Sequence, residues 1–231
     1  MLVGEIRVSS ISLSCMLKPF SAVIFDMDGV IVDSEPRHEK AFLEIFDELG
    51  FGQTHGIHFP DYIGRSDKAV WVDFIAEHKP AYSYEDLTAM KQNRFIEILR
   101  KEQPIFDGLP ELVGKLTAKY PAAVASGSLH PVIDEVLVLK NLRSYFSAVV
   151  SSQDVANAKP APDVFLRAAE LLEKKPDECV VIEDSLAGVE AGLSAGMQVI
   201  AITNSFAKEK LGRAHHIVHN YEEIERLLGV A

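Results

Sequence analysis

The stretch Ala22-Val23-Ile24-Phe25-Asp26-Met27-Asp28-Gly29-Val30 decides the fold class of this 231-residue chain. Its first four residues form a continuous apolar run, which is typical of a strand buried on both faces of a parallel sheet. Two carboxylates, Asp26 and Asp28, follow at once, and open α/β sheets bind their ligands at the carboxyl ends of strands. The stretch therefore predicts an α/β protein with an acidic site at the end of its first strand.

Similar apolar runs recur along the chain and alternate with helical patterns. The runs are 122–125, 148–150, 180–182, 199–202 and, more weakly, 217–218. Three helical patterns between them begin near Pro110, Pro131 and Pro162, where a proline without an N–H does no harm. A fourth runs from about Leu186 and stops at Gly196. This alternation predicts a doubly wound, Rossmann-like parallel sheet.

The interval between the first strand and Leu109 breaks this rhythm, because it contains no convincing buried strand. It has three helical patterns instead, each with an apolar stripe on one face. We therefore expect a helical domain at 35–105, inserted into an α/β core made of 18–34 and 106–231. Serines interrupt residues 1–17, unlike the apolar core of a signal peptide, so we expect a loose N-terminal extension there.

Composition and charge exclude several classes of protein. Hydrophobic residues make up 48% and charged residues 25%, as in an ordinary globular chain, and no apolar run approaches the ~20 residues of a membrane span. A net charge of −11 repels a phosphate backbone, so we expect neither nucleic acid nor a membrane as partner. Two cysteines fit a reducing compartment. We expect a cytoplasmic monomer that acts on a small molecule.

Three further strand ends carry polar side chains. Ser126-Gly127 follows the second run, Lys159 the third, and Glu183-Asp184 the fourth. A hydroxyl with backbone N–H groups suits a phosphate oxygen, although Ser-Gly is also a common turn and Lys159 alone also fits a surface lysine. Two acidic pairs at one sheet edge destabilise the fold unless a cation compensates them. Together the four ends predict Mg²⁺-assisted phosphoryl transfer, with one carboxylate free to form an aspartyl-phosphate.

At this point the chain resembles a known family. Asp26-Met27-Asp28-Gly29-Val30-Ile31-Val32-Asp33-Ser34-Glu35 is similar to the first motif of the haloacid dehalogenase superfamily, and Ser126, Lys159 and Glu183-Asp184 fall where its other three motifs stand. The segments 159–163 and 181–192 are similar to the branch that contains β-phosphoglucomutase and the helical-cap sugar phosphatases. The resemblance covers nearly all of the chain from Phe20 to Leu228.

The resemblance implies a role for each motif residue. Asp26 would be the nucleophile, and Asp28 would protonate the leaving oxygen and then activate water. Relatives that cleave carbon–halogen bonds lack the second aspartate, so Asp28 indicates phosphate-ester chemistry. The implied binding groups are Ser126, Gly127 and Lys159 for the phosphoryl group, and Asp26, Asp28, Glu183 and Asp184 for Mg²⁺.

The inserted helices resemble the mobile cap of this branch, which excludes water and contacts substrate. Candidate substrate contacts are His38, Arg65 and Lys91. His38 and Arg65 resemble positions that the mutase uses, although His38 also fits a helix surface and Arg65 a turn brace. Lys91 fits a solvated helix face better than a binding site.

The leading hypothesis is a Mg²⁺-dependent phosphatase acting on a small phosphorylated metabolite of the sugar phosphate class. A phosphomutase of the β-phosphoglucomutase kind shares every core residue, but His130 stands where the mutase presents an amide side chain. A non-enzymatic phospho-acceptor, such as a signalling receiver, is a remote alternative, because receivers are shorter and lack both the Asp-x-Asp pair and a cap.

Overall fold

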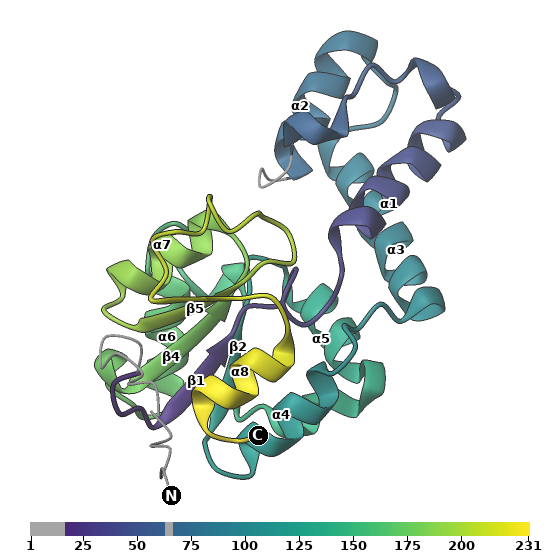
Figure 1. Ribbon diagram of the computed structural model, residues 1–231. Helices are drawn as coiled ribbons and strands as arrows, with labels where there is room; N and C mark the ends of the chain where they lie inside the picture. The colour runs from purple at the N-terminus through teal and green to yellow at the C-terminus, as the bar shows by residue number, and fades with distance from the viewer. Residues whose placement is uncertain (1–16, 63–66) are drawn as a thin grey trace, which may run out of the picture.

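A six-stranded, all-parallel sheet forms the centre of the molecule (Figure 1). The structure is a computed structural model that describes residues 17–62 and 67–231, so the predicted extension and Arg65 lie outside the described residues. The strand order is β3-β2-β1-β4-β5-β6, which confirms the predicted doubly wound fold. The strands are β1 (Ala22–Phe25), β2 (Ala122–Ala125), β3 (Ala148–Val150), β4 (Cys179–Glu183), β5 (Gln198–Ile202) and β6 (His216–Val218).

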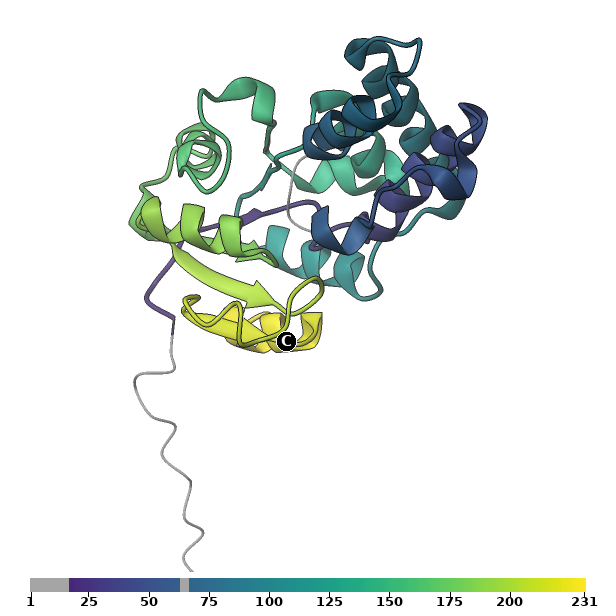
Figure 2. The same ribbon diagram turned by 90° about the horizontal axis from the view of Figure 1, so that it is seen from above.

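Helices cover both faces of this sheet. The α-helices are α1 (Glu35–Glu48), α2 (Asp67–His78), α3 (Tyr84–Glu102), α4 (Leu109–Thr117), α5 (His130–Val138), α6 (Asp163–Leu171), α7 (Leu186–Ser194) and α8 (Tyr221–Leu228). Short 3₁₀ helices connect them at η2 (Gly52–Thr54), η3 (Phe59–Tyr62), η4 (Leu139–Tyr145), η5 (Ser152–Asp154) and η6 (Pro176–Glu178). Figure 2 shows α7 (yellow-green) and α8 (yellow) on opposite sides of the sheet.

Each strand contributes to two hydrophobic cores because its side chains alternate between the faces of the sheet. Val23 and Phe25 pack in the core under α4, α5 and α8. Ala22 and Ile24 pack in the core under α6 and α7. All four residues of β1 have no exposed surface, which explains why the apolar run is continuous.

Local signals in the sequence mark most helix ends. Pro110 and Pro131 occupy the first turns of α4 and α5, and Gly196 has the positive φ of 77° suited to a residue after a helix. The helix α8 was not predicted. The signals for it were Asn220, whose side chain accepts a hydrogen bond from the Glu223 N–H, and a glycine directly after its end.

The helices α1, α2 and α3, here called the cap helices, stand away from the sheet (Figure 1). They have their own aromatic core, which includes Phe42, Phe46, Trp71 and Phe74. The three helical patterns expected in the inserted interval are therefore present, while the domain boundaries at 35 and 105 stay a prediction.

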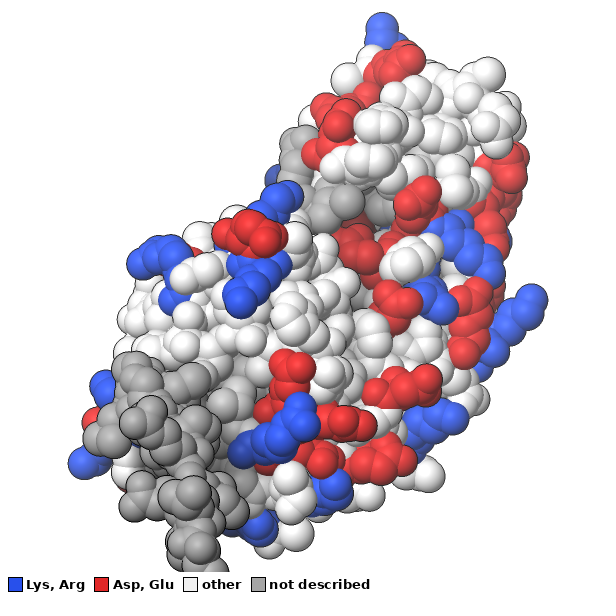
Figure 3. Space-filling view, in the orientation of Figure 1, with Lys and Arg blue, Asp and Glu red and all other residues white. Residues whose placement is uncertain are grey.

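The surface carries both signs of charge. In the face shown in Figure 3, acidic and basic side chains are intermixed over the sheet domain and the cap helices. Within the parts of the chain that the structure describes, no helix has the length and apolar character needed to cross a membrane.

Candidate active site

The predicted motif residues meet at the carboxyl edge of the sheet. β1 lies between β2 and β4, so the segments that follow these three strands become neighbours. They line a cavity of about 840 Å³ that the cap helices also border. Ser126 is buried, with 0% exposure, at the end of β2. The other described candidates all line the cavity: Asp26, Asp28, His38, Lys91, Gly127, Lys159, Glu183 and Asp184.

Lys159 neutralises two of the buried acids. Its Nζ contacts Asp26 Oδ1 and donates to Glu183 Oε1 at 2.8 Å, and it lies 4.7 Å from the centre of the Phe165 ring. Burial alone would lower the pKa of Lys159, but the charges of Asp26 and Glu183 raise it above its ordinary value. Lys159 is therefore a cation beside the two acids.

Asp26, Glu183 and Asp184 form a buried acid cluster whose ligand atoms lie within 4.8 Å of one another. Burial raises the pKa of Asp26 to about 8, although Lys159 opposes the shift. Burial and the neighbouring charge of Glu183 also raise the pKa of Asp184 well above its usual range. Carboxylates in this state are stabilised by a cation that shares their oxygens.

The oxygens of Glu183 are already occupied by hydrogen-bond donors. Oε1 accepts from Lys159, and Oε2 accepts from the Asp184 N–H at 2.8 Å, the Ser185 N–H at 2.7 Å and the Ser185 hydroxyl at 2.9 Å. A carboxylate offers about four acceptor positions. The geometry therefore gives Glu183 the role of holding Lys159 and the turn after β4, and leaves it little capacity for a metal.

Asp26 and Asp184, beside the turn that carries Asp28, are better placed to hold a hard cation. Oδ1 of Asp28 is buried and has no hydrogen-bond partner among the described residues. Gly29 makes room beside them, because a Cβ there would lie 1.8 Å from Asp184 Oδ2. Mg²⁺ prefers oxygen ligands, and carboxylate oxygens come close together at Gly29. These residues therefore fit the ion that the family resemblance implies.

Asp28 is ionised and held from two sides. The Ser128 hydroxyl donates to its Oδ2 at 2.8 Å, and His38 Nε2 lies 3.9 Å from its Oδ1. Burial alone would raise the pKa of Asp28, but His38, Ser34 and Ser128 together lower it to about 2. Without substrate, Asp28 is therefore a carboxylate that can accept a proton.

The turn after β2 presents two hydroxyls to this carboxylate. The Ser126 hydroxyl accepts from the Ser128 N–H at 2.9 Å and lies 3.4 Å from Asp28 Oδ2. The contribution of Ser128 was missed in the sequence, where the signal was the second hydroxyl of Ser126-Gly127-Ser128. The chain then enters α5, so the turn lies near the positive end of a helix dipole.

The prediction that Lys91 fits a solvated helix face is wrong. Its residue exposure is 2%, and its Nζ donates to Asp67 Oδ2 at 2.6 Å and contacts His38 Nδ1. The same Nζ lies 4.9 Å from the ring centres of Phe42 and Phe95. Burial lowers the pKa of Lys91, while Asp67 opposes the shift. The sequence pattern did not reveal that Lys91 is buried, because its ammonium group is compensated by an acid from α2 and by two aromatic rings.

His38 is oriented by these contacts. An ammonium has only hydrogen-bond donors, so His38 Nδ1 accepts from Lys91 and the imidazole proton is on Nε2, the nitrogen nearest Asp28. The imidazole also stacks on Phe95, with 3.9 Å between ring centres. His38 therefore connects the cap helices to the acidic site.

Comparison with known proteins identifies the family. The family model for haloacid dehalogenase-like hydrolases matches residues 20–196, most of the chain and all four motifs. The chain belongs to the haloacid dehalogenase-like hydrolases. This confirms the resemblance found in the sequence and the prediction of an enzyme.

Named phosphatases are among the relatives of this haloacid dehalogenase-like hydrolase. The fructose-1-phosphate phosphatase of Escherichia coli K12 is 31% identical over 191 residues, covering 81% of this chain and 98% of that one. Hexitol phosphatase B of the same strain is 31% identical over 183 residues, covering 78% and 82%. The crystal structure of a candidate β-phosphoglucomutase from Thermotoga maritima matches with a TM-score of 0.77 and 28% identity, covering 91% of this chain and 99% of that one.

Proposed function

We propose that this protein is a Mg²⁺-dependent phosphatase that hydrolyses a small sugar phosphate through an aspartyl-phosphate on Asp26. One observation carries the proposal: Asp26 directly follows the central strand β1 and lines the cavity, in contact with Lys159 and beside Glu183 and Asp184 at the end of β4. The phosphatase relatives act on fructose 1-phosphate and hexitol phosphates according to their names, which supports this substrate class.

In the first half-reaction, a carboxylate oxygen of Asp26 attacks phosphorus as the bond between phosphorus and the ester oxygen breaks. Lys159 and the turn of Ser126 and Gly127 hold the phosphoryl oxygens. Asp28 transfers a proton to the leaving oxygen. The pKa of Asp28 is about 2 in the free protein. A phosphate dianion beside Asp28 raises this pKa, so the carboxyl group can be protonated when substrate is bound.

In the second half-reaction, Asp28 is again a carboxylate and removes a proton from water. The water oxygen bonds to phosphorus while the bond between phosphorus and Asp26 breaks, which releases inorganic phosphate. Asp26, Asp184 and the backbone carbonyl of Asp28 would hold Mg²⁺, which supplies positive charge that keeps Asp26 ionised and neutralises the phosphoryl oxygens. His38 and Lys91 are the described cap residues that we propose contact the substrate.

We expect Asp184→Ala to weaken Mg²⁺ binding, because it removes a carboxylate from the ligand set. The half-saturating Mg²⁺ concentration should rise by at least the ~10–100-fold that loss of an outer-shell partner costs. Excess Mg²⁺ should restore part of the activity. The matched control is Asp177→Ala, at an exposed position on η6. An unchanged Mg²⁺ dependence would remove Asp184 from the ligand set.

The alternative of a phosphomutase differs only in which acceptor takes the phosphoryl group from Asp26. In the structure His130 does not line the cavity, and its Nε2 is 3.0 Å from Asp154. His130 therefore does not take the place in the cavity that the amide of the mutase has. We therefore expect net release of inorganic phosphate, with no requirement for a bisphosphate primer.

The experiment supplies β-glucose 1-phosphate with a trace of the 1,6-bisphosphate and follows glucose 6-phosphate and inorganic phosphate together. A panel of phosphorylated sugars and sugar alcohols, each with and without Mg²⁺, identifies the substrate. Rapid isomerisation with little phosphate released would replace the phosphatase proposal with the mutase.

A further inference from the structure

Two consecutive residues after β5 contact both acidic segments of the site. Asn204 Nδ2 donates to the backbone carbonyl of Gly29 at 2.7 Å, in the turn that carries Asp28. The Ser205 hydroxyl lies beside Asp184 at the same turn, because a Cβ on Gly29 would be 2.7 Å from Ser205 Oγ and 1.8 Å from Asp184 Oδ2. Both residues line the catalytic cavity, but neither belongs to the four motifs, and both lie beyond the residues 20–196 that match the family model.

Tyr221, the first residue of α8, is hydrogen-bonded to Asn204. Its hydroxyl donates to the Val30 carbonyl at 2.7 Å and accepts from Asn204 Nδ2 at 3.2 Å. Tyr221 is 8% exposed, and its ring centre lies 6.1 Å from that of Phe106. The two Nδ2 hydrogens of Asn204 and the hydroxyl hydrogen of Tyr221 are thus all used. These hydrogen bonds hold two successive carbonyls of the turn, those of Gly29 and Val30.

Holding these carbonyls fixes the orientation of the Asp28 backbone. The Gly29 N–H donates to the Val32 carbonyl at 2.9 Å. Because the peptide between Asp28 and Gly29 is planar and trans, the Asp28 carbonyl points in the opposite direction from this N–H. The next peptide is held at its carbonyl by Asn204. Gly29 has a φ of 77°, a conformation that only glycine adopts readily, and the side chains of Asn204 and Tyr221 add to the hydrogen bonds within the turn.

We propose that Asn204, Ser205 and Tyr221, here called the β5 clasp, are positioning residues that hold the Asp28–Gly29 turn against Asp184 and thereby set the metal affinity of the site. The inference rests on the proposed function, because it assumes that these acids hold Mg²⁺. Its basis is that Asn204 binds the Gly29 carbonyl, that Ser205 lies beside Asp184 at the same glycine, and that the buried Tyr221 hydroxyl contacts both Asn204 and the turn. Outer-shell partners of this kind orient metal ligands in other proteins.

The test compares Tyr221→Phe and Asn204→Ala with wild type in a calorimetric titration with Mg²⁺ alone. Each variant should bind Mg²⁺ at least ~10-fold more weakly, because the Asp28 carbonyl and Asp184 lose their common alignment. With p-nitrophenyl phosphate, kcat should fall at a fixed Mg²⁺ concentration while KM for the ester changes little. Asn204→Leu keeps approximately the size of the side chain without its N–H donors and without a new charge, and it should behave as Asn204→Ala.

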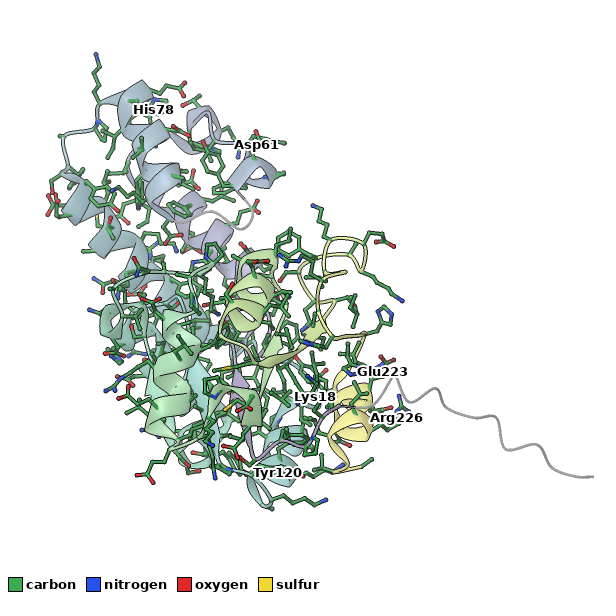
Figure 4. The ribbon with its side chains drawn as sticks, turned by 90° about the vertical axis from the view of Figure 1, so that its left-hand side faces the viewer. Lys18, Asp61, His78, Tyr120, Glu223 and Arg226 are labelled. Carbon is green, nitrogen blue, oxygen red and sulfur yellow. The ribbon has the colours of Figure 1, made fainter. Side chains whose placement is uncertain are left out.

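Two control variants remove the same groups elsewhere. The first is Tyr120→Phe, and Tyr120 lies at the end of the molecule opposite the cap helices (Figure 4). The second is Asn93→Ala, and Asn93 is exposed on α3. Neither residue lines the catalytic cavity, and both variants should match wild type in Mg²⁺ affinity. The double variant Asn204→Ala/Tyr221→Phe should lose less affinity than the product of the single effects, because the two residues act through one network.

Lower melting temperatures with unchanged Mg²⁺ affinity would make the clasp purely structural and overturn the inference. If Tyr221→Phe does not fold, Asn204→Ala decides, because Asn204 is exposed. Wild type that binds Mg²⁺ but hydrolyses no phosphate ester would refute the proposed function, while the affinity comparison would still decide the inference. Wild type that binds no Mg²⁺ would overturn both the metal site and the clasp.

Discussion

Asp26→Asn is expected to abolish turnover, with a loss on the order of 10⁴- to 10⁶-fold, the scale seen when a hydrolase loses its nucleophile. The amide cannot attack phosphorus to form an acyl-phosphate. The fold should survive, because Lys159 keeps its hydrogen bond to Glu183 and the substitution removes one of three crowded acids. Phosphate release and the melting temperature measure the two effects separately.

Acid quenching makes this prediction specific to the nucleophile. Wild type stopped with acid after brief turnover of a ³²P-labelled ester should retain covalently bound phosphate, and Asp26→Asn should retain none. The matched control is Asp134→Asn, at an exposed position on α5, which should keep both activity and label. Label on the Asp26→Asn chain, or turnover above a few per cent of wild type, would assign the nucleophile to another residue.

Asp28→Asn is expected to slow turnover by ~10²–10⁴-fold, the contribution typical of general acid–base catalysis. The asparagine keeps the size of the side chain and its contact with Ser128, but it can neither give a proton to the leaving oxygen nor take one from water. The loss should be smaller for a nitrophenyl ester than for a sugar phosphate, because nitrophenolate leaves with little protonation.

Leaving groups of graded pKa therefore test the role of Asp28. A plot of the logarithm of the rate against leaving-group pKa should be steeper for Asp28→Asn than for wild type in the first half-reaction. Single-turnover measurements isolate that step from hydrolysis of the aspartyl-phosphate. Equal losses for good and poor leaving groups would show that Asp28 acts as a charge or a structural contact and not as the acid.

The family and the class of chemistry could be read from short segments of the chain. β1 is buried on both faces, so its four residues must all be apolar, and the acids that follow it are adjacent in sequence. Neither feature depends on distant residues. The same locality explains why the three cap helices were predicted, since each has an apolar stripe of its own.

Part of the environment of each charged group comes from segments that are distant in the sequence. Lys91 looked solvated because its compensating partners, Asp67 and the rings of Phe42 and Phe95, come from other turns of the cap helices. Glu183 was predicted as a metal ligand, and its oxygens also accept hydrogen bonds from Lys159 and the turn after β4, so its place in the ligand set stays a prediction. The residue type gives the chemical group, but its hydrogen-bond and charge partners in the fold determine its role.

The sequence by itself determined the α/β class, the three helices between β1 and α4 and the motifs of the haloacid dehalogenase-like family, because apolar periodicity and adjacent carboxylates are local properties of the chain. Only the tertiary structure decided which acids keep free lone pairs and which residues brace the turn at Gly29. Asn204 is 175 positions from Gly29, and Tyr221 is 191 positions from Val30. Contacts over such separations arise only when the whole sheet and α8 have assembled, since β4 lies between β1 and β5, so no local pattern could reveal them.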